Sequence, residues 1–394
     1  MSKLQPQVGS LGHLAPYAMQ EESSLGRRFP EPPHPYRSEY QRDRDRVVHA
    51  RAFRRLENKT QVFHTRVSDH FRNRLTHTIE VTQISRTIGA CLELNVDLCE
   101  VLALSHDIGH SPFAHVGEHV LDRLMAEQGE GFDHNLHALH VVEYFEERYA
   151  DFRGLNLMFE VREGIVKHSR DYEGKSPASV DLSEYRLAEK PTLEAQLIDL
   201  ADEIAYSSAD LDDGLESELI SLEQILAEVP FFAGLYREIE RRYPAVTRKL
   251  QFNETLKRLI DLLVTDLVES SRRRLIEAGI KNPLEVRRHA VRLLGFSQEV
   301  ESCKSQLKDF LTRALYHHPD LARGRRVAEQ MVERMFRHYM ECPEDLPRNH
   351  YVRLGGSPPH RVVCDYIAGM TDSFIQTRYQ EVFGPIEVPA PRPG

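Results

Sequence analysis

Residues 96–108 form an unusually apolar stretch that ends in two polar side chains. They read Val-Asp-Leu-Cys-Glu-Val-Leu-Ala-Leu-Ser-His-Asp-Ile. So few polar positions are typical of a helix that is buried on most sides, rather than of an amphipathic surface helix. Gly109 and Pro112 end this helix, so that His106 and Asp107 stand at its last turn. Because an unpaired charge is costly to bury, the fold has to bring a compensating partner to this point.

Helical spacing recurs along the rest of the chain. Residues 74–94 carry a clear apolar face that includes Leu75, Ile79 and Ile88. Strand-like alternation is scarce, and residues 296–300 are the best short candidate. We therefore predict a mostly α protein. Helices are expected near residues 43–56, 74–94, 96–108, 115–127, 135–149, 158–169, 192–213, 217–228, 230–242, 253–277, 284–293, 300–316, 321–340 and 360–383.

The composition of the chain changes along its length and predicts four regions. Residues 1–40 are rich in Pro, Gly, Ser and charge, and we expect an arm that wraps the body or a neighbouring subunit. Residues 41–300 form the main helical domain, residues 301–384 a C-terminal helical region, and residues 385–394 a frayed Pro-rich tail. Within the main domain, residues 170–187 predict a loop over the site.

The overall composition excludes several classes of protein. The 394 residues include 51 Lys and Arg against 61 Asp and Glu, a formal net charge of −10, which argues against a generic nucleic-acid coat. The five cysteines form no Cys-x-x-Cys pair, which argues against a disulfide framework or a thiolate zinc site and favours a reducing compartment. No apolar run is long enough for a membrane span, and the N-terminus lacks a signal peptide's apolar core. We expect a cytoplasmic protein without a membrane segment.

A second polar feature lies at residues 199–213, which show helical spacing and contain no Gly or Pro. Asp202, Tyr206, Asp210 and Asp213 fall at i, i+4, i+8 and i+11 and therefore share one face. No basic residue lies within the stretch to offset these carboxylates. Two interpretations remain open. The face is a solvated acidic surface, or it meets a cation or a hydroxyl-rich ligand.

The adjacent imidazole and carboxylate of His106 and Asp107 suit a divalent metal, although a hydrogen bond that closes a helix is the simpler alternative. His77, on the polar edge of the preceding helix, and Asp202 would complete a set of two imidazoles and two carboxylates. Such a set leaves positions open for water and a phosphate oxygen. Mn, Mg, Fe, Co, Ni and Zn are all candidates, and the sequence does not determine which metal is bound.

The ordered His, His-Asp and Asp residues occur together with further motifs. These are Gln41-Arg-Asp-Arg-Asp-Arg46, Ala52-Phe-Arg-Arg-Leu56, Lys59-Thr-Gln-Val62, Arg74-Leu-Thr-His77-Thr-Ile-Glu-Val81, His106-Asp-Ile-Gly-His110-Ser-Pro-Phe-Ala-His115-Val-Gly-Glu118, Phe132-Asp-His-Asn135, Glu163-Gly-Ile-Val-Lys-His168, Asp202-Glu-Ile-Ala-Tyr206 and Asp365-Tyr-Ile-Ala-Gly-Met-Thr-Asp372. With them the chain resembles the HD-domain phosphohydrolase superfamily and, within it, the dGTPase-like deoxynucleoside triphosphate triphosphohydrolases. The resemblance spans roughly residues 24–384. Ala114 stands where the family usually has Gly, and Leu136-His137 where Ala and Gln are common.

The resemblance implies an HD-domain helical bundle, here residues 41–300, with additional C-terminal helices. It also implies metal-dependent hydrolysis of a deoxynucleoside triphosphate (dNTP) to deoxynucleoside and inorganic triphosphate, by attack at the α-phosphorus. His77, His106, Asp107 and Asp202 would bind the metal.

The implied catalytic and substrate-binding residues follow from the same motifs. His115 and Glu118 lie i, i+3 apart, so that Glu118 can fix the tautomer of a proton-transferring His115, which acts as base or as acid. The remaining candidates are His110 as a phosphate donor, His134 as an acid or as a residue that supports those in contact with the substrate, Arg74 and Arg55 for the triphosphate, and Gln61, Tyr206 and Asp210 for the sugar.

Other functions remain open at this point. A deoxynucleoside 5′-monophosphatase would need less basic surface, and a regulatory nucleotide-binding HD protein would have a silent site. We expect a homo-oligomer built from dimers, with a hexamer as one form. A nucleotide or single-stranded DNA is a candidate effector, and the preferred base and any activator are open.

Overall fold

The computed structural model describes residues 14–62, 71–172 and 180–385 of the chain. Within these residues the structure is helical, with two isolated β-bridges in place of a sheet, so the mostly α prediction is confirmed. None of the helices described is long and apolar enough to cross a membrane. The α-helices are α1 (Glu39–Val48), α2 (Arg51–Arg55), α3 (Arg74–Cys91), α4 (Val96–Ser105), α5 (Ala114–Ala126), α6 (His134–His140), α7 (Phe159–Val166), α8 (Leu193–Glu216), α9 (Leu222–Glu228), α10 (Pro230–Arg242), α11 (Arg248–Ala278), α12 (Pro283–Arg288), α13 (Gln298–Leu311), α14 (Pro319–Glu341), α15 (Arg348–Tyr351), α16 (Pro359–Ala368) and α17 (Asp372–Phe383).

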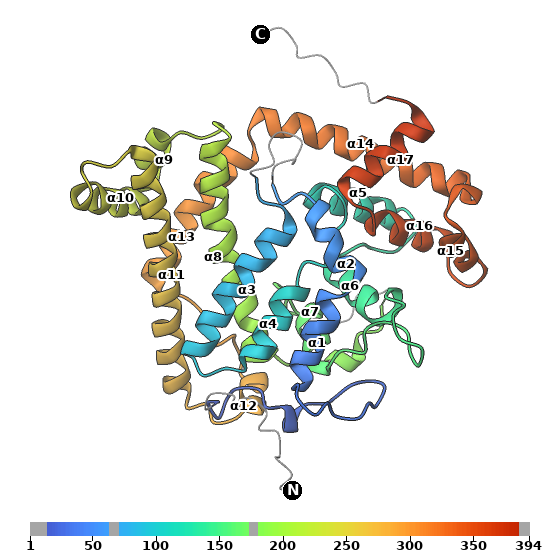
Figure 1. Ribbon diagram of the computed structural model, residues 1–394, viewed down its shortest axis with the longest axis horizontal. Coiled ribbons are helices and arrows are strands. Elements are labelled where there is room, and N and C mark those ends of the chain that lie inside the picture. Colours follow the sequence, from blue (N-terminus) through green and yellow to red (C-terminus); the bar gives the residue numbers. More distant parts are fainter. Residues whose placement is uncertain (1–13, 63–70, 173–179, 386–394) are drawn as a thin grey trace, which may run out of the picture.

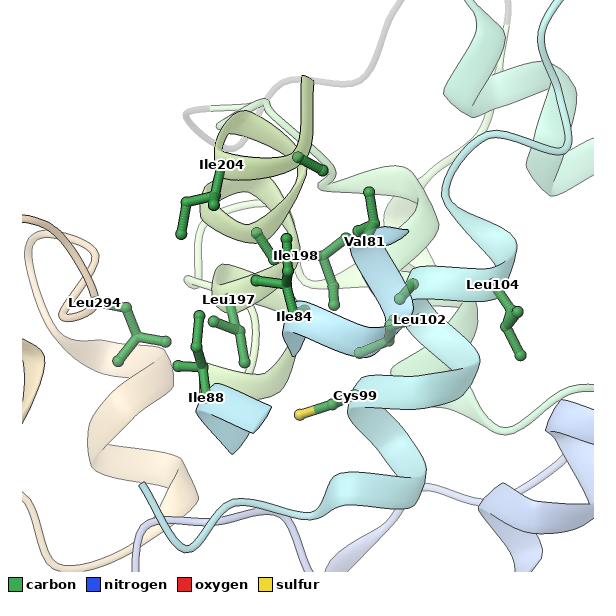
Figure 2. Close-up of a cluster of buried hydrophobic side chains, with 14 of the residues drawn as sticks. Val81, Ile84, Ile88, Cys99, Leu102, Leu104, Leu197, Ile198, Ile204 and Leu294 are labelled. Atoms are coloured by element: carbon green, nitrogen blue, oxygen red, sulfur yellow. The ribbon is translucent and has the colours of Figure 1, made fainter. Parts of the chain in front are cut away.

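Helices α3, α4 and α8 cross at the centre of the molecule (Figure 1). The apolar stretch of the sequence is α4, which begins where the Asn95 side chain accepts from the backbone N–H of Leu98 at 3.1 Å. Figure 2 shows side chains such as Ile84 of α3, Leu102 of α4 and Ile198 of α8 meeting between these helices. The burial expected for residues 96–108 is therefore found, and it fixes the position of the polar pair at the end of α4.

A first hydrophobic cluster surrounds this crossing and reaches from α1 to α13. Helix α1 packs on α4, and the long helix α11 packs on α8 and α10. The described part of the N-terminal arm lies on the same body, because Ala15 N–H donates to Glu93 O at 2.9 Å and Arg27 pairs with Asp43. The predicted tail lies almost entirely outside the described residues.

A second, smaller hydrophobic cluster contains α14, α16 and α17 together with α5. In Figure 1 these helices gather on one side of the molecule. Leu121 and Leu124 of α5 pack there with Met335 of α14 and Ile367 of α16. Helix α5 comes from the middle of the chain, so the second cluster is not built from C-terminal residues alone.

Several boundaries differ from the sequence prediction. The strand candidate at residues 296–300 is wrong, because Ser297 caps the start of α13. The helix expected at 43–56 divides into α1 and α2 at Ala50, which is extended. The helix expected at 360–383 divides into α16 and α17, where the Thr371 side chain caps a new helix. Much of the predicted loop at 170–187, residues 173–179, lies outside the described residues.

Candidate active site

The four predicted metal ligands converge from α3, α4 and α8. His77 Nε2 lies 2.8 Å from Asp202 Oδ1, and His106 Nε2 lies 3.5 Å from Asp107 Oδ1 and 4.0 Å from Asp202 Oδ1. Neighbouring ligands of one first-row metal ion lie about 3 Å apart, because each sits about 2.1 Å from the ion. His77, His106 and Asp107 are buried, and the Asp202 side chain remains 23% exposed. Of these four side chains in the described part of the chain, that of Asp202 is the most exposed to solvent.

The His106 ring is oriented as a metal ligand requires. Its Nδ1 lies 2.6 Å from the carbonyl oxygen of Ala103 and has to be the donor, since a carbonyl only accepts. Nε2 then carries a lone pair, and this buried atom has no hydrogen-bond partner. Burial lowers the pKa of His106, which keeps the imidazole neutral. A buried, unpartnered lone pair beside two carboxylates fits a divalent cation.

Asp107 is held by two further side chains. Its Oδ2 accepts from Arg74 Nη1 at 2.6 Å, and its Oδ1 lies 3.1 Å from His110 Nε2. Burial alone would raise the pKa of Asp107, but Arg74 and the histidines His106 and His110 hold it well below its usual value. The carboxylate therefore stays ionised and faces the convergence point of the other ligands.

The turn after α4 carries the second group of predicted residues. A Cβ atom on Gly109 would lie 2.1 Å from the carbonyl oxygen of His134, so only glycine allows this close approach. Phe113 and Ala114 both have left-handed backbone angles, with φ of 62° and 56°. Glycine would adopt this conformation without strain, which explains physically why Gly is usual at the position of Ala114 in the family that the sequence resembles.

His110, His134 and Glu118 form one connected cluster. The rings of His110 and His134 stack with centroids 4.0 Å apart. Glu118 Oε1 lies 2.7 Å from His134 Nδ1, whereas Glu118 Oε2 lies 3.4 Å from Nδ1 of His115, whose side chain is 82% exposed. Burial raises the pKa of Glu118, but His115 and His134 outweigh this and lower it overall. Glu118 therefore holds His134 more tightly than the His115 that its helical spacing predicts.

The acidic face of α8 is not a solvated surface, because each carboxylate has a partner from another part of the chain. Asp202 contacts His77, Asp213 pairs with Arg72, and Asp210 Oδ2 accepts from the Tyr316 hydroxyl. Burial raises the pKa of Asp210 to about 7, although the Tyr316 hydrogen bond acts in the opposite direction. Tyr206 lies between Asp202 and Asp210 and is half-buried.

Two of the predicted substrate residues have different surroundings. Gln61 Oε1 is buried without a hydrogen-bond partner. Arg55 Nη1 donates to the carbonyl oxygen of Gly369 at 2.8 Å, on the turn between α16 and α17. Arg55 therefore contacts the C-terminal region. The side-chain oxygen of Gln61 makes no hydrogen bond to another predicted site residue among those that the structure describes.

Comparison with known proteins agrees with this geometry. Residues 74–207 match the HD domain, and residues 294–381 match the phosphohydrolase-associated domain. The chain is 44% identical over 376 residues to the deoxyguanosinetriphosphate triphosphohydrolase-like protein of Bordetella pertussis, which covers 95% of this chain and 97% of the relative. The like-named protein of Ralstonia nicotianae is 45% identical over 94% and 95% of the two chains, and that of Geobacter sulfurreducens 43% identical over 95% and 96%.

The chain belongs to the deoxyguanosinetriphosphate triphosphohydrolase-like family of HD-domain proteins. The resemblance inferred from its motifs is confirmed, and so is the HD helical fold with additional C-terminal helices. It is a metal-dependent phosphohydrolase by family, and its buried His and Asp side chains could hold the ion.

Two residues near the ligand set of this HD-domain protein had no role in the sequence prediction. His168 Nδ1 lies 2.6 Å from Asp199 Oδ1, and the His168 ring lies 5.3 Å from that of His106. Burial lowers and Asp199 raises the pKa of His168, which reaches about 9. Asp199 is itself bound by Arg292. The signal was weak but present, because His168 ends a family motif and Asp199 precedes Asp202 by one helical turn.

The turn that follows α4, which carries the predicted catalytic residue His110, is also attached to the C-terminal region. Lys59 Nζ donates to the carbonyl oxygens of His110 and Ala368. Asp372 accepts from the backbone N–H of Thr60 and of Phe113, each at 2.9 Å. Burial, together with the neighbouring Arg55, lowers the pKa of Lys59 to about 7. The contacts of Ala368 and Asp372 join residues more than 250 positions apart, which local sequence patterns do not reveal.

A separate hollow of about 770 Å³ lies between α3, α8 and α11. Its lining carries both signs of charge, including Arg72, Glu80 and Lys257, and none of the four predicted metal ligands. Because none of these ligands lines it, the hollow is not the candidate reaction site, although it is large.

Proposed function

We propose that this protein hydrolyses deoxynucleoside triphosphates to deoxynucleoside and inorganic triphosphate in a metal-dependent reaction. The observation that carries the proposal is the buried, unpartnered Nε2 of His106, directed to the same point as Asp107 and Asp202. When bound there, a divalent cation would supply Lewis-acid stabilisation of phosphate charge and a water of lowered pKa.

Arg74 and His110 would lie beside the α-phosphate. Both contact Asp107, so they lie at the edge of the ligand set, where the α-phosphate would be placed. Arg74 Nε and His110 Nδ1 are buried without hydrogen-bond partners, which leaves each side chain with capacity for a further contact. Burial, Arg74 and His134 lower the pKa of His110, so its imidazole is neutral and carries a single N–H. That N–H lies on Nε2 and donates to Asp107, so the free Nδ1 is an acceptor and Arg74 is the hydrogen-bond donor that would meet a phosphate oxygen.

The His115, Glu118 and His134 group would transfer the proton to the leaving 5′ oxygen. Glu118 lies within hydrogen-bond reach of both imidazoles and orients them. The exposure of His115 suits a group that meets a substrate arriving from solvent, while His134 is the better held of the two. The sugar would lie farther along α8, with Tyr206 against C2′ and Asp210 accepting from the 3′ hydroxyl.

Product analysis in the presence of Mn²⁺, with each of the four dNTPs and separately with the matching deoxynucleoside 5′-monophosphates, tests the proposal. We expect deoxynucleoside and intact triphosphate in equal amounts. Release of orthophosphate from a deoxynucleoside 5′-monophosphate, with dNTPs left intact, would replace the proposal with a monophosphatase. Binding of dNTPs without any product would replace it with a regulatory HD protein.

A homo-oligomer built from dimers, a nucleotide or single-stranded DNA effector, and a cytoplasmic location remain predictions for this chain. Light scattering at micromolar protein concentration, with and without nucleotide, measures the oligomeric state. A monomer under both conditions would contradict it.

A further inference from the structure

Three side chains of ligand type meet at the C-terminal end of α14, away from the predicted catalytic residues. His338 lies in the last turn of α14, Cys342 caps it, and Asp345 ends the 3-10 turn η6 (Pro343–Asp345). Their ligand atoms all lie within 4.8 Å of one another. The spacing is His-x₃-Cys-x₂-Asp, which a search for paired cysteines does not detect. The three atoms offer nitrogen, sulfur and oxygen to a common point.

The His338 ring is directed at this point rather than at a hydrogen-bond partner. Its Nε2 lies 2.8 Å from Asp345 Oδ2, yet this buried atom makes no hydrogen bond, because the direction of the approach is unsuitable. Two ligands of one ion show such a short separation without pointing at each other. The ring is also fixed by edge contacts with Tyr339 and Phe383, at centroid distances of 5.2 and 5.7 Å. The nitrogen is therefore preorganised.

The local charge favours a cation. Glu341 and Glu344 flank the thiol together with Asp345, and the C-terminal end of a long helix adds negative potential. Burial and these carboxylates raise the pKa of the Cys342 thiol. A bound cation would release this proton, since a metal-bound cysteine is a thiolate.

We propose that His338, Cys342 and Asp345 form a second metal site, which takes a borderline-soft divalent cation of the zinc class. Zinc accepts this mixture of nitrogen, sulfur and oxygen ligands in tetrahedral geometry, and a water completes the fourth position. The ion would tie the end of α14 to η6 and so stabilise the second hydrophobic cluster. The site shares no residue with the catalytic ligand set and does not depend on the proposed dNTP hydrolysis.

Cobalt(II) distinguishes the two sites, because only the proposed site supplies a sulfur ligand. The full chain is treated with a chelator and titrated with Co²⁺ while its absorption spectrum is recorded. We expect a sulfur-to-cobalt charge-transfer band that saturates within two equivalents per chain, one for each proposed site, and is removed by added Zn²⁺. The catalytic set, which contains no cysteine, contributes nothing to this band.

Substitutions show which residues bind the cobalt ion that gives rise to the band. Cys342→Ser should abolish it, and Asp345→Asn should weaken Co²⁺ binding at least tenfold. Cys303→Ser, at another partly exposed cysteine, is the matched control and should leave the band unchanged. Asp345 is half-exposed, so its variant tests the site without disturbing the core. Absence of the band in the wild type, its survival in Cys342→Ser, or its loss in Cys303→Ser would each overturn the proposal.

Discussion

The two hydrophobic clusters of the molecule contribute differently to the candidate active site. The first cluster holds α3, α4 and α8, and with them all four predicted metal ligands. The second cluster holds α5, which carries His115 and Glu118. The proposed metal binding and the proposed proton transfer are thus attached to different parts of the core. Substitutions should therefore be able to remove one of these functions while the other remains.

The largest effect is expected from the first cluster. Asp107→Asn removes a charged ligand that no other side chain replaces, so bound metal and turnover should both fall to background while the helical fold survives. Elemental analysis measures the bound metal, and kcat with a dNTP measures turnover. Asp212→Asn, a partly exposed carboxylate of α8 outside the ligand set, is the control. Full metal occupancy in Asp107→Asn would exclude Asp107 as a ligand.

Glu118→Gln should impair the proposed proton transfer and leave metal binding intact. It keeps the shape of the side chain but removes the charge that orients His134 and His115. We expect kcat to fall about 10²- to 10⁴-fold, the usual contribution of general acid–base groups, with metal content unchanged. If metal is lost together with activity, the proposed division between the clusters fails.

Asp372 tests whether the second cluster positions the turn after α4, and with it the proposed catalytic residues, from a distance. Asp372→Ala removes the acceptor of the Thr60 and Phe113 N–H groups, at a cost of about 1–3 kcal/mol in the free energy of unfolding for each contact. We expect kcat to fall about tenfold, with KM and metal content near the wild-type values. Ser373→Ala, at the exposed neighbouring residue, should leave kcat unchanged. An unaltered kcat in Asp372→Ala would show that the turn holds its shape without this link.

The smallest effect is expected at the sugar end of α8. Tyr206→Ala should narrow the ratio of kcat/KM for dNTP over NTP by several-fold to about tenfold, because space for a 2′ hydroxyl is opened. Asp210→Ala should instead lower dNTP turnover and reduce the penalty on 2′,3′-dideoxy substrates. Competition between dNTP and NTP measures the ratio. An unchanged ratio in Tyr206→Ala would mean that the acidic face of α8 does not recognise the sugar and contributes only the proposed metal ligand Asp202.

Much of this arrangement could be predicted from sequence, and the reasons differ by residue. His106 and Asp107 are neighbours at the end of an apolar helix, and the acidic face of α8 repeats with the helical period, so local spacing identifies both. Local spacing does not name partners such as Tyr316 for Asp210, 106 positions away. Likewise, the amphipathic pattern of α5 predicts a buried face but not the cluster in which it is buried. The start of α17 is predictable from the sequence, because Thr371 is a typical N-cap residue and Asp372 adds a negative charge in the first turn.

The fate of the attacking oxygen tests the central claim, hydrolysis at the α-phosphorus, most directly. A dNTP is turned over by the metal-loaded wild-type protein in oxygen-18-labelled water, and the products are separated and weighed by mass spectrometry. Water that attacks the α-phosphorus keeps its oxygen on that phosphorus, so we expect one labelled oxygen in the inorganic triphosphate and none in the deoxynucleoside. Label in orthophosphate or in the deoxynucleoside would contradict attack at the α-phosphorus, and label in a deoxynucleoside monophosphate would show that pyrophosphate leaves instead of the 5′ oxygen, which contradicts the proposed products.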